Sequence, residues 1–258
     1  MANLNGDASQ RIVVVTGGAS GIGRACTETL IERIPGCRVV LIDNENQLLQ
    51  SFSRTLGDNV LPIHADVANV DSVQDAFERA REWAGHDITD LVACAGNQAK
   101  RASVDLTAEE WHAILRVHLD GTFYCCQAAA KQMLNSGGGA IVTFSSVAEL
   151  FAWPARLPYA VAKAGISALT RTLAVEWGGA GIRVNAVAPG YVNTPMMDSA
   201  IKSGRLTEDV TQLHALNRMA APVEIATVVT FLLSSDASFV TGETLFADGG
   251  FRAKKVSW

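Results

Sequence analysis

The chain has 258 residues, of which 48% are hydrophobic and 18% are charged, and its formal net charge is −5. This composition excludes a disordered chain, because the apolar fraction is high and the charge density is low. A nucleic-acid-binding protein is not expected either, since 26 Asp and Glu residues outnumber 21 Lys and Arg residues and the sequence contains no basic run.

Signals for export, membrane insertion and metal binding are missing from the sequence. The N-terminal residues show no charged segment followed by an apolar stretch, and no run approaches the roughly 18 apolar residues of a membrane span. The five cysteines lack C-x-x-C spacing and the five histidines lack H-x-H or H-E-x-x-H spacing, so neither a disulfide framework nor a metal site is expected. We expect a cytoplasmic protein without metal, membrane or nucleic-acid partners.

Short apolar runs rich in β-branched residues alternate with helical patterns along the chain. After the first run, Ile22, Cys26, Leu30 and Ile34 recur at helical spacing. A longer helix is expected from about residue 107 to 135, with an N-cap and acidic first turn at its start. Seven strands are predicted, at residues 12–15, 39–42, 60–63, 91–95, 140–144, 182–187 and 243–247.

Strand–helix alternation of this kind predicts an α/β fold. Both a doubly wound sheet and a TIM barrel fit the number of alternations. No Pro/Gly/Ser-rich linker divides residues 1–258, so a single domain is expected. The longest stretch without a strand, residues 189–242, predicts a substrate lid within about 190–216.

A glycine-rich loop follows the first predicted strand and opens a helix. Residues 16–23 read Thr-Gly-Gly-Ala-Ser-Gly-Ile-Gly, and glycines at these places permit a tight turn and close approach of the backbone to a pyrophosphate. The helix N-terminus then presents free N–H groups to the phosphates. The loop therefore predicts a dinucleotide site that involves Gly17, Ser20, Gly21, Ile22 and Gly23.

An acidic residue ends the second predicted strand. Asp43 lies about 20 residues after Gly23, and a carboxylate at this place accepts hydrogen bonds from the ribose hydroxyls of NAD. It would also repel the 2′-phosphate of NADP. Ser20 stands where a basic residue would favour NADP, so the sequence favours NAD as the cofactor.

Tyr159 and Lys163 lie four residues apart and therefore share one face of a predicted helix. An ammonium group beside a phenol favours the phenolate and brings the phenol closer to the working pH of a general acid/base. Taken alone, a Tyr–Lys pair on a helix is most often a surface feature. Ser146, which follows the fifth predicted strand, adds a third polar group to this pair.

Together these motifs resemble the short-chain dehydrogenase/reductase family in its classical form, over nearly the whole chain. The loop is similar to the family's T-G-x-x-x-G-x-G, Tyr159 and Lys163 match its Y-x-x-x-K, and Ser146 matches its catalytic serine. The resemblance implies a Rossmann-type, doubly wound parallel sheet of about seven strands with helices on both faces. It also implies an NAD-dependent oxidoreductase that interconverts a secondary alcohol and a ketone.

The resemblance further implies a role for each matching residue. Tyr159 would exchange a proton with the substrate oxygen, Ser146 would bind that oxygen, and Lys163 would hold the nicotinamide ribose and lower the pKa of Tyr159. It also implies a homotetramer with paired helices at about 107–135 and 158–177. Further cofactor contacts are implied for Asp66 and Val67 at the adenine, Ala95 and Gly96 at its ribose, and Pro189, Gly190, Val192 and Thr194 at the nicotinamide.

Two departures from the family pattern stand out. The usual N-N-A-G after the fourth strand is Ala93-Cys-Ala-Gly96 here, which removes two Asn side chains and their hydrogen bonds. His118 stands where the family has an Asn that helps to hold a proton-relaying water, largely through its backbone carbonyl. We hypothesise that His118 keeps the relay, with its imidazole as a further participant; the alternative is that it only packs against the helix.

The segments 97–103, 147–157 and 191–216 are expected to form the substrate pocket. They offer Glu149, Phe151, Trp153, Arg156, Met196 and Met197 as candidate substrate contacts. This mixture leaves open a cyclic alcohol, a sugar or polyol, and a hydroxysteroid as substrates, while an NADPH-linked 3-oxoacyl reductase is disfavoured. A cofactor-binding regulatory protein without turnover is the alternative from a different functional class.

Overall fold

Seven parallel strands form one open sheet in the order β3-β2-β1-β4-β5-β6-β7. The computed structural model describes residues 11–98, 100–202, 204 and 209–254. The predicted doubly wound α/β fold is confirmed, and the open sheet excludes the TIM barrel, which would close β3 onto β7. The strands are β1 (Ile12–Thr16), β2 (Arg38–Asp43), β3 (Val60–His64), β4 (Asp90–Ala93), β5 (Gly139–Phe144), β6 (Ile182–Pro189) and β7 (Thr244–Ala247).

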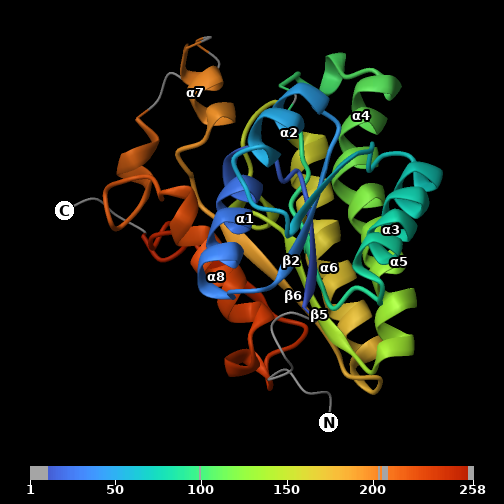
Figure 1. The fold of residues 1–258 in the computed structure, drawn as a ribbon. Coiled ribbons are helices and arrows are strands. Elements are labelled where there is room, and N and C mark those ends of the chain that lie inside the picture. Colours follow the sequence, from blue (N-terminus) through green and yellow to red (C-terminus); the bar gives the residue numbers. More distant parts are fainter. Residues whose placement is uncertain (1–10, 99, 203, 205–208, 255–258) are drawn as a thin grey trace.

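Helices cover both faces of the sheet, with α1 and α8 on one side and α3 and α5 on the other (Figure 1). Two separate apolar clusters result, one on each face. The helices of the α/β layers are α1 (Gly21–Arg33), α2 (Asn46–Ser53), α3 (Val70–Ala84), α4 (Ala108–Leu115), α5 (Gly121–Ser136), α6 (Leu157–Gly178), α7 (Pro195–Lys202) and α8 (Pro222–Leu233). Short 3-10 turns lie at Ser103–Asp105, Val147–Glu149, Val210–Leu213 and Ser235–Ala237.

The central strands are buried along their whole length, because both faces of the sheet are covered. Every residue of β1, β4, β5 and β6 is buried. This burial explains why these segments are nearly continuous apolar runs rather than alternating ones. All seven strand predictions correspond to observed strands, and their bounds differ by at most a few residues.

The helix predicted from about 107 to 135 is interrupted in the structure. α4 leads into a π-helical segment at Arg116–Asp120, and α5 follows directly. Thr107 and Glu110 form a reciprocal capping box at the start, and Gly137, with φ of 90°, ends the last turn. The π segment carries His118, which places a wider turn of helix at a predicted site residue.

The order of strands reverses on either side of β1 and β4, and a crevice opens at such a point beyond the carboxyl ends of the strands. α7 and the turn at Val210–Leu213 rise from this end of the sheet (Figure 1). They form the described part of the predicted lid; residues 203 and 205–208 of that range lie outside the described residues. No helix in the described part of the chain is long and apolar enough to cross a membrane.

Candidate active site

One cavity of about 850 Å³ lies at the carboxyl ends of the strands. It is lined by every predicted cofactor residue, from the glycine loop through β2 and β4 to the segment after β6. It is also lined by Ser146, Tyr159, Lys163 and His118. The fold therefore joins residues from distant parts of the chain in a single site. The predicted cofactor residues in its wall are Gly17, Ser20, Gly21, Ile22, Gly23, Asp43, Asp66, Val67, Ala95, Gly96, Pro189, Gly190, Val192 and Thr194.

The glycine loop is packed too closely for side chains at two of its positions. A Cβ on Gly23 would lie 2.2 Å from the carbonyl oxygen of Gly17. A Cβ on Gly17 would lie 2.9 Å from Cα of Ala95, and the φ of Gly17 is +65°. The loop can therefore bring its backbone directly against a ligand at the start of α1, as the phosphates of a dinucleotide require.

Asp43 lies beside the glycine loop at the end of β2. Its carboxylate accepts hydrogen bonds from the backbone N–H groups of Ala19 and Glu45, each at 3.0 Å. The side chain is thus held facing the cavity, where a ribose would lie. Arg24, the nearest cation in sequence, turns away instead: it pairs with Glu28 at 3.0 Å and stacks over the ring of Phe52.

The departure from the family pattern after β4 is compensated by a hydroxyl. Thr16 Oγ1 accepts hydrogen bonds from the backbone N–H groups of Cys94 at 3.1 Å and Ala95 at 3.2 Å. Cys94 itself is partly buried, and desolvation raises the pKa of its thiol to about 12. This thiol is therefore neutral at physiological pH, and the turn is held by β1 rather than by Asn side chains.

Ser146, Tyr159 and Lys163 converge between β5 and α6. The Ser146 hydroxyl is hydrogen-bonded to the Tyr159 phenol, and the Nζ of Lys163 lies 5.5 Å from the centre of the Tyr159 ring. Lys163 is buried, and its Nζ donates a hydrogen bond to the carbonyl of Phe144 at 2.7 Å. Proximity of these three groups in one cavity is what general acid/base catalysis at a substrate oxygen requires.

The electrostatics of the pair differ from the prediction based on spacing alone. Burial raises the pKa of Tyr159, and the hydrogen bond from Ser146 and the charge of Arg156 only partly oppose this effect. Burial also lowers the pKa of Lys163 to about 8. The pKa of Tyr159 is therefore raised rather than lowered, because desolvation of the phenol outweighs the hydrogen bond from Ser146 and the charge of Arg156.

His118 is buried beside Tyr159, with the two rings edge-to-face at 5.3 Å. Its Nε2 lies 2.8 Å from the carbonyl oxygen and 3.1 Å from the backbone nitrogen of Asn97, while its Nδ1 has no hydrogen-bond partner among the described residues. Burial lowers the pKa of His118 to about 3, so the imidazole is neutral at physiological pH. The His118 carbonyl accepts a hydrogen bond from Thr122 Oγ1 at 2.6 Å.

Four of the six predicted substrate residues line the cavity: Trp153, Arg156, Met196 and Met197. Glu149 and Phe151 are not among the residues that line the cavity. The Glu149 carboxylate turns toward the hydroxyls of Ser145 and Ser167, and the ring of Phe151 packs edge-on against Phe251 at 5.4 Å. Both lie in or just after a short 3-10 turn, where side-chain direction follows no simple period.

Some residues lie in the segments expected to form the pocket but were not singled out individually. Gln98 and Lys100 line the cavity, and Gln98 accepts a hydrogen bond from Arg156 at 3.2 Å. Buried His214 accepts a hydrogen bond from the backbone N–H of Tyr191 at 3.1 Å and so joins the turn at Val210–Leu213 to the segment after β6. No motif marks these residues, because their places depend on loops that meet only in the folded chain.

This combination of an open parallel sheet, a glycine loop at its switch point and a Ser–Tyr–Lys cluster defines a nucleotide-binding α/β protein of the oxidoreductase type. A family profile described as enoyl-(acyl carrier protein) reductase matches residues 17–252. The chain belongs to the short-chain dehydrogenase/reductase family.

Individual relatives agree with this assignment. The chain is 38% identical over 250 residues to cis-4-hydroxycyclohexanecarboxylate dehydrogenase of Sinomonas cyclohexanicum, covering 95% of this chain and 98% of that protein. It is 35% identical over 248 residues to D-threitol dehydrogenase of Mycolicibacterium smegmatis, covering 95% and 94% of the two chains. A solved structure described as the crystal structure of gox2181 superposes with a TM-score of 0.88 at 33% identity, covering 96% and 99%.

Proposed function

We propose that the protein is an NAD-dependent dehydrogenase that interconverts a secondary alcohol and a ketone. The observation that carries this proposal is the meeting of Ser146, Tyr159 and Lys163 with the glycine loop and Asp43 in one cavity. In the oxidation direction, the alcohol and NAD⁺ give the ketone, NADH and a proton. When bound, the nicotinamide supplies the hydride chemistry, and the protein's residues bind, orient and move the proton.

The proton is handled by Tyr159. Its phenol gives a proton to the substrate oxygen during reduction and, as phenolate, takes it back during oxidation. The Ser146 hydroxyl, hydrogen-bonded to Tyr159, holds the same oxygen and stabilises its developing charge. Buried Lys163 binds the nicotinamide ribose, and its charge favours the phenolate as the reaction proceeds.

His118 is proposed to support this proton path through its backbone carbonyl and as a neutral ring beside Tyr159. With a pKa of about 3, its imidazole cannot gain a stable proton at physiological pH. Its unpartnered, buried Nδ1 is the atom at which a bridging water would bind. This role differs from that of a general base, which would need a pKa near the working pH.

The cofactor preference rests on charge. The acidic side chains of Asp43, Glu45 and Asp66 line the adenosine end of the cavity, whereas its cationic lining residues, Lys100, Arg156 and Lys163, belong to the substrate end. A 2′-phosphate at Asp43 would meet a carboxylate, with no neighbouring cation among the lining residues that the structure describes. NAD is therefore proposed over NADP.

Trp153, Met196 and Met197 give the substrate pocket an apolar wall. This wall favours a ring alcohol over a polyol, a choice also supported by the relative named as a hydroxycyclohexanecarboxylate dehydrogenase. A hydroxysteroid remains the second candidate, because apolar walls also suit a larger ring system. A 3-oxoacyl reductase is disfavoured by the proposed NAD preference.

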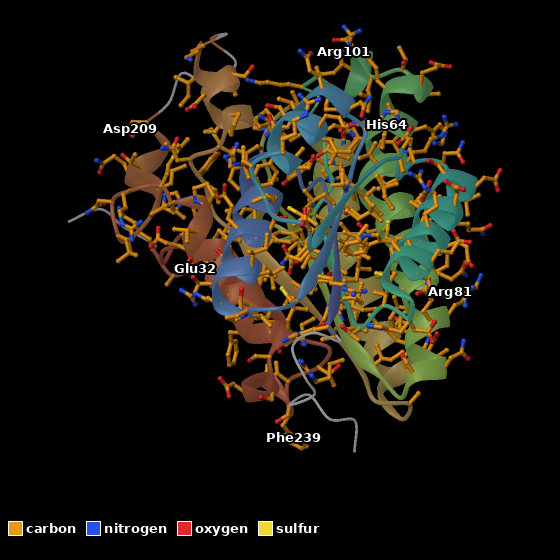
Figure 2. All side chains as sticks on the ribbon, in the orientation of Figure 1. Glu32, His64, Arg81, Arg101, Asp209 and Phe239 are labelled. Atoms are coloured by element: carbon orange, nitrogen blue, oxygen red, sulfur yellow. The ribbon has the colours of Figure 1, made fainter. Side chains whose placement is uncertain are left out.

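We further propose a cytoplasmic homotetramer. The helices α5 and α6 carry exposed apolar side chains, namely Phe123, Val161 and Val175, which support pairing of these helices between subunits. The fully exposed ring of Phe239, before β7, supports a second contact between subunits there. Figure 2 shows Phe239 at the end of the molecule opposite Arg101. Light scattering that gives the mass of a monomer would contradict this assembly.

The function is tested by measuring NADH and NADPH formation in parallel with a panel of secondary ring alcohols. We expect turnover with NAD, a preference over NADP of at least tenfold, and a loss of about a thousandfold in kcat for Tyr159→Phe with NADH binding retained. Asp43→Ser is expected to reduce the NAD preference by at least tenfold. Binding of NADH without turnover, unaffected by Tyr159→Phe, would instead identify a regulatory NAD-binding protein.

A further inference from the structure

The two ends of the cavity carry opposite charges. Its acidic lining residues, Asp43, Glu45 and Asp66, follow β2 and β3 at the adenosine end. The segments at the Tyr159 end contribute cations instead, and no Asp or Glu from them is among the described lining residues. A substrate that enters beside Tyr159 therefore meets a positive potential, which favours a negatively charged molecule.

Arg156 is the cation closest in sequence to the reacting groups. It lines the cavity three residues before Tyr159, and its charge lowers the pKa of that phenol, partly opposing the effect of burial. Its Nη1 donates a hydrogen bond to Gln98 at 3.2 Å, and no carboxylate of the described residues forms an ion pair with it. A guanidinium carries five N–H donors in a planar fork, so a neutral amide partner leaves most of them for a ligand.

A neighbouring arginine shows the opposite arrangement. Arg101 forms an ion pair with Glu110 at 2.9 Å and is half exposed. Figure 2 shows it at the outer edge of the molecule, at the end where α7 lies in Figure 1. Its charge is therefore neutralised by the protein itself, whereas the charge of Arg156 faces the cavity.

The backbone conformation of the preceding turn fixes the position from which the Arg156 side chain extends. Ala155 adopts φ of 62°, a left-handed conformation that costs conformational energy in a residue with a Cβ. Its carbonyl accepts a hydrogen bond from the backbone N–H of Arg101 at 3.1 Å, which holds this turn. Arg156 is the N-cap of α6, the helix that carries Tyr159, so the guanidinium is attached directly before the rigid element that holds the phenol.

The remaining walls around Arg156 are largely apolar. Trp153 from the preceding turn and Met196 and Met197 from α7 line the same part of the cavity. Apolar walls exclude water from a bound ligand and strengthen a charge-assisted hydrogen bond inside the pocket. The pocket thus combines apolar walls with one guanidinium group, that of Arg156, held in a fixed position.

We propose that the substrate is a secondary alcohol with a carboxylate on an apolar body, and that Arg156 binds this carboxylate while Ser146 and Tyr159 hold the reacting oxygen. This inference rests on the function proposed above and specifies its substrate class. A carboxylate matches the planar fork of the guanidinium with two parallel hydrogen bonds. Arg156 is then a specificity-determining residue: it selects the substrate and fixes which carbon faces the nicotinamide.

The test uses a panel of 3- and 4-hydroxycyclohexanecarboxylates and open-chain hydroxy acids, each matched with its neutral primary amide. Wild-type kcat/KM is measured with NAD by NADH absorbance. We expect at least one acid to be used at least tenfold better than its amide. Arg156→Gln is expected to raise KM for that acid by about tenfold to a hundredfold, with the amide changed less than about twofold, and Arg156→Lys is expected to recover part of the loss.

Two controls separate the possible outcomes. Arg101→Gln removes a cation of the same region that is already paired, and it should leave both substrates unchanged. A wild type that prefers amides, or an Arg156→Gln variant that loses acid and amide equally, overturns the inference and leaves the dehydrogenase function intact. If no alcohol is turned over, calorimetric titration of acid and amide into the NADH-bound protein decides: acid-selective binding that Arg156→Gln abolishes supports the Arg156 site and rejects the dehydrogenase, and absence of such binding rejects both.

Discussion

The two ends of the cavity are built in different ways. The cofactor end is formed by backbone atoms of the glycine loop, which pack against the turn after β4, and by one carboxylate fixed by two N–H groups. The substrate end is formed by side chains such as Trp153 and Met196 that project from a turn and a short helix. A site made from backbone tolerates almost no change at its contact points, whereas a site made from side chains can change its ligand by substitution.

Because the cofactor end is built from backbone atoms, we predict the largest loss of NADH binding for a substitution at Gly23. In Gly23→Ala, the added Cβ would meet the Gly17 carbonyl oxygen at 2.2 Å, so the loop must shift away from its position. We expect NADH binding, followed by fluorescence, to weaken more than a hundredfold, and stability to fall by about 3 kcal/mol. Gly178→Ala is the matched control, because its Cβ would meet nothing within 4 Å. Equal NADH affinity in the two variants would show that the loop is less constrained than its packing indicates.

The same difference explains how much of the molecule could be predicted from the sequence. The seven strands and the glycine loop follow from local patterns, because a buried parallel strand is a continuous apolar run and a phosphate loop needs glycine at fixed places. Backbone geometry sets these patterns, so the same sequence pattern recurs wherever that geometry occurs.

The substrate end was predicted only in part, for physical reasons. Arg156 and Trp153 line the cavity as predicted, but Glu149 and Phe151 from the same segment turn elsewhere. In a turn without a 2- or 3.6-residue period, the direction of each side chain is decided by partners distant in sequence. Phe251 illustrates this dependence, since its contact with Phe151 joins two segments a hundred residues apart.

His118 lines the same cavity as the residues of both ends, and its buried imidazole makes stability depend on pH. Its pKa of about 3 in the folded protein is below the unfolded value of 6.5, so the unfolded chain binds the proton first as the pH falls. Stability therefore decreases between pH 6.5 and pH 3. We expect this group to account for a loss of about 2 kcal/mol between pH 6.5 and pH 4.5.

Denaturant unfolding at several pH values tests this expectation. His118→Asn should remove that part of the acid-dependent loss, whereas His112→Asn, at an exposed position of α4, should keep it. Identical pH profiles for the wild type and His118→Asn would contradict a buried, neutral imidazole. In the same variant, unchanged turnover and an unchanged pH–rate profile, together with the same result for His118→Ala, would remove His118 from the proton path.

The smallest predicted effect concerns Glu149, which links the loop after β5 to α6. Its carboxylate is hydrogen-bonded to the hydroxyls of Ser145 and Ser167, and Ser145 Oγ lies 3.0 Å from the carbonyl oxygen of Lys163. This network joins the loop that carries Ser146 to the helix that carries Lys163. Replacing the carboxylate weakens a charge-assisted contact, whose loss is worth about 1 to 2 kcal/mol.

Glu149→Gln is therefore expected to lower kcat about tenfold, since Ser146 and Lys163 lose their fixed spacing, while KM for NAD changes less than about twofold. The exposed Glu109 of α4 offers the matched control, Glu109→Gln, which should leave kcat unchanged. A raised KM for NAD at constant kcat would place Glu149 with the cofactor end. An unchanged kcat would mean that α6 and the loop after β5 hold their spacing through backbone packing alone.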